Sequence, residues 1–220
     1  MAMPDKMQAR YFRRYGFEAH TIIDVGVLNG TPFLYDCFPD RHFVMIDPLE
    51  ESRAAVAENW GHLDHEFHVC ALGAQPGLME LQVEAGRLAR SSFRARRDGG
   101  TPAERRRVQV RRLDDLVASH AGPLGLKIDT EGAELEVLRG ATATLRRCEF
   151  VITETSIKKR FVDGYRFSEV IAFMAEQGFE VYSFLSGLTR APRMADVLFI
   201  PADSPRFDMG RNRNADAQAA

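Results

Sequence analysis

Short apolar runs that end on or beside a carboxylate recur along this chain, and this repeat constrains its fold more than any other feature. Stretches with helical spacing separate most of the runs. Alternating strands and helices pack as a mostly parallel sheet with helices on both faces. Ligands bind such sheets beyond the carboxyl ends of the strands. We therefore predict an α/β fold with a site at that edge. The acids expected there are Asp24, Asp47, Asp129 and Glu154.

The remaining periodicities complete this expected fold. We predict strands over residues 21–25, 42–47, 67–72, 78–83, 124–128, 150–154, 179–184 and 197–200. We predict helices over residues 51–60, 135–145 and around 170–174. Gly140 interrupts the second of these helices, and Gly178 is placed to cap the third.

Composition limits the classes of protein that fit. A chain of 220 residues is typical of one domain. A net charge of −2 gives no field that would attract nucleic acid or an anionic membrane, so we expect neither as a partner. No apolar stretch approaches the roughly 18 residues of a membrane span, and residues 1–20 do not resemble a secretory signal. Three scattered cysteines form no CxxC pair, which fits free thiols in a reducing cytoplasm.

The chain divides into a core domain and flanking segments. We predict a covering segment over residues 1–20, whose aromatic stretch 11–15 packs on the domain or forms a homodimer contact. The core domain spans residues 21–201 and carries an arginine-rich insertion at about 84–112. The insertion is either a solvated loop or a lid that recruits an anionic acceptor. Residues 202–220 form a polar tail, which we expect to fray from residue 211 onward.

A glycine turn follows the first predicted strand. Gly26 and Gly30 allow a sharp turn and a close approach of the backbone to a ligand. The spacing is not that of the dinucleotide fingerprint, whose second glycine is missing. Asp24 would repel a pyrophosphate but attract an ammonium group, such as that of S-adenosylmethionine. Asp47 is placed to accept the hydroxyls of a ribose.

The motifs, taken together, resemble the FkbM methyltransferase family from about residue 21 to residue 200. The most specific is the block Leu126-Lys127-Ile128-Asp129-Thr130-Glu131-Gly132-Ala133-Glu134. The others are Asp24-x-Gly26-x-x-x-Gly30, Asp47-Pro48, Ala71-Leu72-Gly73, Ser91-Ser92-Phe93 and Leu113-Asp114-Asp115-Leu116. The resemblance implies a Rossmann-like class I methyltransferase fold with a mostly parallel seven-stranded sheet. It also implies S-adenosylmethionine as cofactor and, commonly, O-methylation of a sugar or natural product.

The resemblance also implies roles for individual residues. The glycines would flank the methionine part of the cofactor, Asp47 would hold the ribose, and the Ala71-Leu72 pair would lie near the adenine. The cofactor contacts predicted in this way are Asp24, Gly26, Val27, Asn29, Gly30, Asp47, Pro48, Ala71 and Leu72. The chain departs from the family at Leu28, where asparagine is usual, and Asn29 follows one place later.

The acceptor end calls for a base, because an alcohol is a poor nucleophile. Glu131 is the preferred base or acceptor-binding carboxylate, and Asp129 and Glu154 are further catalytic candidates. A divalent ion between Asp129 and Glu154 is possible but not predicted. Lys127 is expected to pair with a neighbouring acid rather than to act in catalysis.

Three histidines, His62, His65 and His68, are spaced by threes, but a strand would turn the last two to opposite faces, so no metal is predicted there. The function predicted is O-methylation of a small-molecule hydroxyl. A nicotinamide oxidoreductase and a non-catalytic binding module remain as alternatives.

Overall fold

A seven-stranded sheet forms the centre of the computed structural model, which describes residues 6–84, 86–97, 99, 104–187, 189 and 191–208. Its strands are β3 (His65–Val69), β2 (His42–Asp47), β1 (Thr21–Val25), β7 (Leu124–Ile128), β8 (Cys148–Ser156), β10 (Met194–Pro201) and β9 (Phe179–Phe184), in this spatial order. The first five are parallel, and β10 is antiparallel to both its neighbours. The predicted fold class, a mostly parallel Rossmann-like sheet, is confirmed.

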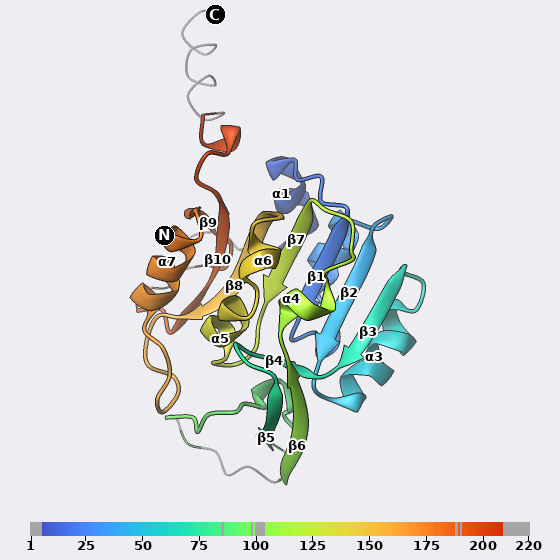
Figure 1. The fold of residues 1–220 in the computed structure, drawn as a ribbon, viewed down its shortest axis with the longest axis vertical. Helices are drawn as coiled ribbons and strands as arrows, with labels where there is room; N and C mark the ends of the chain where they lie inside the picture. Colours follow the sequence, from blue (N-terminus) through green and yellow to red (C-terminus); the bar gives the residue numbers. More distant parts are fainter. Residues whose placement is uncertain are drawn as a thin grey trace, which may run out of the picture.

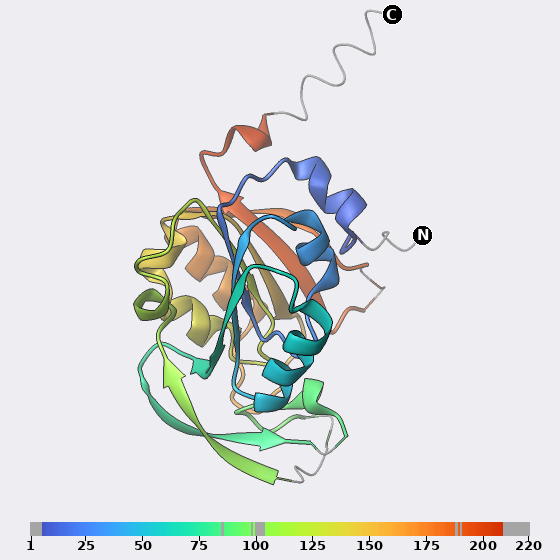
Figure 2. The same ribbon diagram turned by 90° about the vertical axis from the view of Figure 1, so that its right-hand side faces the viewer.

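Helices cover both faces of this sheet, as Figure 2 shows. One face carries α1 (Ala9–Phe12), α2 (Pro32–Cys37) and α3 (Glu50–Trp60); the other carries α4 (Leu113–Leu116), α5 (Glu134–Arg139), α6 (Thr142–Leu145) and α7 (Phe167–Glu176). Neighbouring residues of a strand point to opposite faces. Ile22 therefore packs in the core under α1–α3, while Ile23 packs in the core under α4–α7.

A second, three-stranded sheet lies beyond the carboxyl ends of the parallel strands (Figure 1). It consists of β4 (Ala71–Leu72), β6 (Glu104–Arg111) and β5 (Gly77–Val83). The single strand predicted over 67–72 is wrong in this respect, because the chain leaves the large sheet at Cys70 and enters the small one. The predicted strand over 78–83 corresponds to β5.

The arginine-rich insertion is not a continuous loop, which corrects that expectation. Residues 104–111 form β6, which pairs antiparallel with β5. Val108 and Val110 are buried on one face with Leu81 and Val83, while Gln109 between them and the flanking Arg107 and Arg111 are exposed. Because arginines are so frequent in this segment, the two-residue alternation typical of a strand is not apparent in the sequence. Within the insertion, residues 85, 98 and 100–103 lie outside the described residues.

The predicted break in the helical region over 135–145 is confirmed at Gly140. Helix α5 ends before it, and α6 begins after it. A Cβ atom at Gly140 would lie 2.2 Å from the carbonyl oxygen of Gly73, so this glycine lets the helix approach the chain between β4 and β5 of the small sheet. Gly178 has a φ of 82° directly after α7, as expected for a helix cap.

The chain segments at the two ends of the domain contact each other. Phe12 is 1% exposed and packs edge-on against the rings of Phe33 and Phe150, so residues 9–12 cover the sheet. After β10, a 3-10 turn, η3 (Pro205–Phe207), brings Arg206 to the carbonyl oxygens of Tyr15 and Gly16 at 2.9 and 2.6 Å. The tail is therefore ordered at least to residue 208, and the part predicted to fray lies outside the described residues. No helix in the described ranges is long and apolar enough to cross a membrane.

Candidate active site

A cavity lies between the carboxyl ends of the parallel strands and the small sheet. It encloses about 810 Å³ of non-atom space, part of it open to solvent. Its walls come from the ends of β1, β2, β7 and β8, from β4 and β5, and from residues 88–93, which include the 3-10 turn η2 (Leu88–Arg90). The site is therefore at the edge of the sheet where the sequence predicted it.

The glycine turn after β1 forms one wall of this cavity. Gly26 has a φ of 77°, and a Cβ atom there would lie 1.7 Å from the backbone oxygen of Asp129. Only a residue without a side chain fits this close approach. Leu28 has a φ of 49° and lines the cavity. The turn therefore presents the backbone of Gly26 and the side chain of Leu28 to a ligand.

Asp47 holds this turn in place from the end of β2. Its Oδ2 accepts the N–H of Leu28 and its Oδ1 accepts the N–H of Leu49, both at 3.0 Å. Asp47 is 6% exposed and lines the cavity beside Pro48. Burial raises the pKa of the carboxyl, and the N–H donors oppose this shift. Each oxygen still has a lone pair for a ligand hydroxyl.

The predicted cofactor contacts separate into two groups. Those that line the cavity are Gly26, Asp47, Pro48, Ala71 and Leu72. Those outside its lining are Asp24, Val27, Asn29 and Gly30. Val27 packs in the core under α1–α3. The carbonyl oxygen of Asn29 accepts the indole N–H of Trp60 at 2.9 Å, and a Cβ atom at Gly30 would lie 2.3 Å from the same indole nitrogen.

Asp24 lies beneath the cavity rather than in its wall. It precedes the last residue of β1 and is in register with Met45, two residues before Asp47. It is completely buried, and the hydroxyl of Tyr35 donates to its Oδ2 at 2.7 Å. The charge of Asp24 is therefore compensated within the protein.

Lys127 supplies the opposite charge, as the sequence predicted. Its Nζ is 3.3 Å from Oδ1 of Asp24 and 3.7 Å from Oδ2 of Asp129, and it donates to the carbonyl oxygen of Gly26 at 3.3 Å. Burial alone would lower the pKa of this lysine, but the two carboxylates outweigh burial and raise it. The pair links the sheet to the glycine turn above it.

The three acids predicted for catalysis, Asp129, Glu131 and Glu154, line the cavity together. The backbone of the loop after β7 is tightly constrained: Glu131 has a φ of 51° and Gly132 a φ of 103°. Glu134, which is 1% exposed, accepts the N–H groups of Thr130 and Gly132 at 3.1 and 2.9 Å. These hydrogen bonds fix the direction of the Glu131 side chain.

Two arginines outside the cavity lining contact these acids: Arg96, from the arginine-rich insertion, and Arg160, which the sequence analysis did not single out. Oε2 of Glu131 is 2.7 Å from guanidinium nitrogens of both Arg96 and Arg160. Arg160 also contacts Oε1 of Glu154 at 2.5 Å. Burial and the charge of Asp129 raise the pKa of Glu154 to about 8, against the opposing charge of Arg160. The carboxylates are therefore bridged by guanidinium groups.

This bridging bears on the possible divalent ion between Asp129 and Glu154. Arg160 already occupies one oxygen of Glu154, Oε1. In the described part of the chain, the side chains grouped closely enough to share a metal ion are instead His42, Glu66 and His120, which lie elsewhere.

Comparisons with known proteins agree with this geometry. A model of the methyltransferase FkbM domain matches residues 24–181. The solved FkbM methyltransferase of Methylobacillus flagellatus KT is 15% identical, with a TM-score of 0.56, over 90% of this chain and 48% of that one. The chain thus spans about half the length of that relative, and the likeness at this identity shows a shared fold.

Two other solved structures are similar at lower scores. Magnesium protoporphyrin IX methyltransferase from Synechocystis PCC 6803 is 9% identical over 88% of this chain and 79% of that one, with a TM-score of 0.49. A ribosomal protein L11 methylase from Lactobacillus delbrueckii subsp. bulgaricus is 14% identical over 91% and 81%, with a TM-score of 0.48. A search of curated protein sequences gave no match. Because the family model matches more than half of the chain, the chain belongs to the FkbM methyltransferase family.

Proposed function

We propose that this chain transfers the methyl group of S-adenosylmethionine to a hydroxyl group of a small molecule. The observation that carries the proposal is that one cavity is lined both by the Gly26 turn with Asp47 and by the acids Asp129, Glu131 and Glu154. We call the part at Gly26 and Asp47 the cofactor end and the part at Glu131 and Glu154 the acceptor end. A cavity with a ribose-binding carboxylate at one end and a base at the other suits a methyl donor and an alcohol acceptor.

The cofactor end fits the parts of S-adenosylmethionine. Asp47 accepts the ribose hydroxyls, with its carboxylate already oriented by the N–H groups of Leu28 and Leu49. Ala71 and Leu72 offer an apolar wall to the adenine. We assign the ammonium group of the methionine part to Asp129, whose side chain is 37% exposed, because Asp24 is enclosed beneath the turn.

The acceptor end requires a group that takes the hydroxyl proton. When bound, S-adenosylmethionine supplies an electrophilic methyl group on a sulfonium ion. Glu154 has a pKa raised to about 8, so its ionised form is a stronger base than an ordinary glutamate, and the ionised fraction that can accept the hydroxyl proton grows as the pH rises toward 8. Glu131 is held by two guanidinium groups, and we assign it the binding of the acceptor rather than the proton transfer. Of the two roles that the sequence left open for Glu131, base or acceptor-binding carboxylate, this assignment keeps the second.

The acceptor we propose is a sugar or a natural-product-like molecule with several hydroxyl groups. The arginines around the acceptor end are engaged by the protein's own acids, Arg96 and Arg160 by Glu131 and Arg90 by Glu84. This arrangement favours a neutral polyol over the anionic acceptor considered from the sequence. The three cysteines, all free, support a reducing compartment such as the cytoplasm.

Calorimetric titration with S-adenosylhomocysteine tests the cofactor part of the proposal. We expect micromolar binding by the wild type, no heat with NAD, and loss of binding in Asp47→Ala. Asp40→Ala, a change at an exposed acid before β2, serves as the matched control and should bind as the wild type does. Absence of binding in the folded wild type would refute the proposal, and binding of NAD in its place would support the oxidoreductase alternative.

Incubation with isotope-labelled S-adenosylmethionine tests the acceptor part. Panels of neutral glycosides and of their phosphorylated or nucleotide-linked forms would be compared by mass spectrometry for an added methyl group. Methylation of neutral glycosides supports the proposal, and methylation confined to the phosphorylated forms would assign the anionic acceptor instead. Transfer to a nitrogen or carbon atom would refute O-methylation.

A further inference from the structure

A second group of chemically active side chains lies at the opposite end of the sheet from the cavity. His42 is the first residue of β2, whereas Asp47, in the cavity wall, is the last. Five residues of an extended strand separate the two sites by about 17 Å. The group therefore does not belong to the proposed active site.

Strand register places three members of this group on one face of the sheet. His42 and Val44 lie two residues apart on β2, so their side chains share a face. Val44 is in register with Glu66 of β3, and His68 follows Glu66 by two residues. The side chains of His42, Glu66 and His68 therefore project from the same face. His65 projects from the other, as the sequence predicted, and its Nδ1 lies 2.9 Å from the carbonyl oxygen of Leu63.

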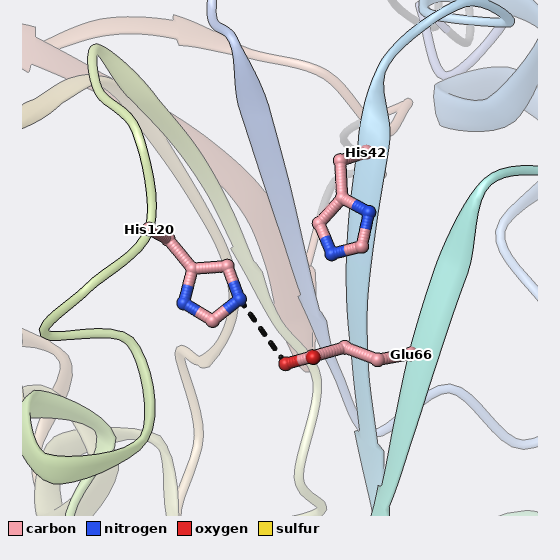
Figure 3. Close-up of side chains that lie close together, drawn as sticks. All are labelled: His42, Glu66 and His120. Carbon is pink, nitrogen blue, oxygen red and sulfur yellow. Dashed lines mark ion pairs between the residues drawn. The ribbon is translucent and has the colours of Figure 1, made fainter.

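His120 reaches the same face from the segment between α4 and β7. Its Nε2 is 3.1 Å from Oε1 of Glu66. Figure 3 shows a ring nitrogen of His42 directed toward the space between these two side chains. The two imidazole rings are nearly parallel, with an interplanar angle of 21° and centroids 5.8 Å apart. One ligand atom from each of His42, Glu66 and His120 lies within 4.8 Å of the other two.

Hydrogen bonds around this triad orient its members as bound metal ligands are oriented. Nδ1 of His42 is 3.2 Å from a carboxylate oxygen of Asp64, which leaves Nε2 of the ring to face the triad. Nε2 of His68 is 2.8 Å from Oε1 of Glu66. A carboxylate behind a ligating histidine fixes its tautomer and the direction of its ring. Asp64 thus holds His42 from behind, and His68 fixes the Glu66 carboxylate through Oε1, the oxygen that also faces His120.

We propose that His42, Glu66 and His120 bind a divalent transition-metal ion of the zinc class, at a site separate from the active site. Two imidazole nitrogens and one carboxylate favour Zn²⁺ over the hard ions Mg²⁺ and Ca²⁺, which prefer oxygen ligands. Zinc ligands at about 2.0–2.1 Å from a tetrahedral ion lie about 3.4 Å from one another. The triad, with mutual distances up to 4.8 Å, needs only small side-chain movements to reach this geometry.

The exposure of the three ligands permits metal to enter from solution. Their side chains are 32%, 39% and 15% exposed for His42, Glu66 and His120. The ion would connect β2, β3 at the edge of the sheet, and the segment before β7, three parts that are far apart in the sequence. Metal binding therefore stabilises the folded chain according to the free ion concentration.

Competition of the chelator-treated full chain with a chromogenic zinc chelator tests the proposal. We expect one zinc ion per chain with a Kd of micromolar or below, and at least tenfold weaker binding in each of His42→Gln, Glu66→Gln and His120→Gln. The matched control is His62→Gln, because His62 is exposed and outside the triad. Magnesium chloride at the same concentrations should not compete.

Far-ultraviolet circular dichroism and S-adenosylhomocysteine binding show whether each variant is folded. Cobalt(II) added to the wild type gives a second measurement, in which intense visible absorption indicates a tetrahedral or five-coordinate site with nitrogen ligands. Zinc affinity equal in the wild type and in folded His42→Gln and His120→Gln variants would overturn the proposal. Weak binding of several zinc ions, or a cobalt spectrum like that of the aqueous ion, would also overturn it.

Discussion

Replacing Lys127 with methionine isolates the energetic role of the buried pair beneath the cavity. Methionine keeps the length and most of the volume of the side chain and removes its charge. In the folded protein Lys127 is 5% exposed and Asp24 is completely buried. The substitution leaves the Asp24 carboxylate in the interior with the Tyr35 hydroxyl at 2.7 Å but without its cation.

The magnitude follows from the cost of an uncompensated buried charge. Breaking a buried ion pair by removing one partner costs about 3–5 kcal/mol. Domains of this kind unfold with a free energy of about 5–15 kcal/mol, so Lys127→Met removes a large share of the stability. Removing the charge of Asp24 as well, in Asp24→Asn with Lys127→Met, eliminates the unpaired carboxylate. We expect a coupling energy of about 1–3 kcal/mol between the two changes.

Urea unfolding followed by the fluorescence of Trp60, the single tryptophan, measures these free energies. The wild type, both single variants and the double variant form a complete cycle. Lys159→Met, at an exposed lysine, is the matched control and should change the free energy of unfolding by less than about 0.5 kcal/mol. If Lys127→Met costs no more than this control, or if the two single losses simply add, the charge of Lys127 does not compensate Asp24.

Three further predictions follow from single contacts. Gly26→Ala should cost about 3 kcal/mol or more and abolish S-adenosylhomocysteine binding, because its Cβ atom would overlap the backbone of Asp129, whereas Gly77→Ala, with open space around it, should change neither property. Glu154 keeps a proton in the folded state up to about pH 8 that the unfolded state releases near 4.5, so its stabilising contribution is complete below 4.5 and is lost as the pH rises through about 8. Glu154→Gln should remove this decline, and melting temperatures across that pH window measure it. Arg206→Ala should expose the amides of residues 6–16 to faster hydrogen exchange, because Arg206 binds the carbonyl oxygens of Tyr15 and Gly16; unchanged exchange would contradict that anchor.

The strands could be predicted from the sequence where the hydrophobic pattern of a segment agrees with its position in the sheet. The runs at 21–25, 42–47 and 124–128 became strands with the bounds expected, because buried strands of a parallel sheet are continuously apolar. Strand β6 was missed because arginines flank its two buried valines, and their charge resembles that of a solvated loop. The two-residue period of a strand is present at residues 104–111, but the arginine-rich composition is typical of a loop.

At the acceptor end, the acids could be predicted from the sequence, but their contacts with arginines could not. Asp129, Glu131 and Glu154 follow or lie within predicted strands, so their place at the sheet edge follows from the fold. Arg96 and Arg160 are 35 and 29 residues from Glu131 in the sequence, and only tertiary packing brings them to it. No spacing rule links residues at such separations. The histidine triad could not be predicted for the same reason, since tertiary packing brings His120 to Glu66 from another segment of the chain.

The position of Asp24 within β1 decides whether this acid of the glycine-turn motif can contact a ligand. An acid before a glycine turn is expected to contact the ligand, but Asp24 precedes Val25 and is in register with Lys127 on β7. It therefore holds Lys127, which in turn donates to the carbonyl oxygen of Gly26. Asp24 therefore affects the cavity indirectly, because it positions the lysine that contacts the glycine turn. Lys127→Met should accordingly weaken S-adenosylhomocysteine binding in molecules that remain folded, although the lysine lies outside the cavity lining.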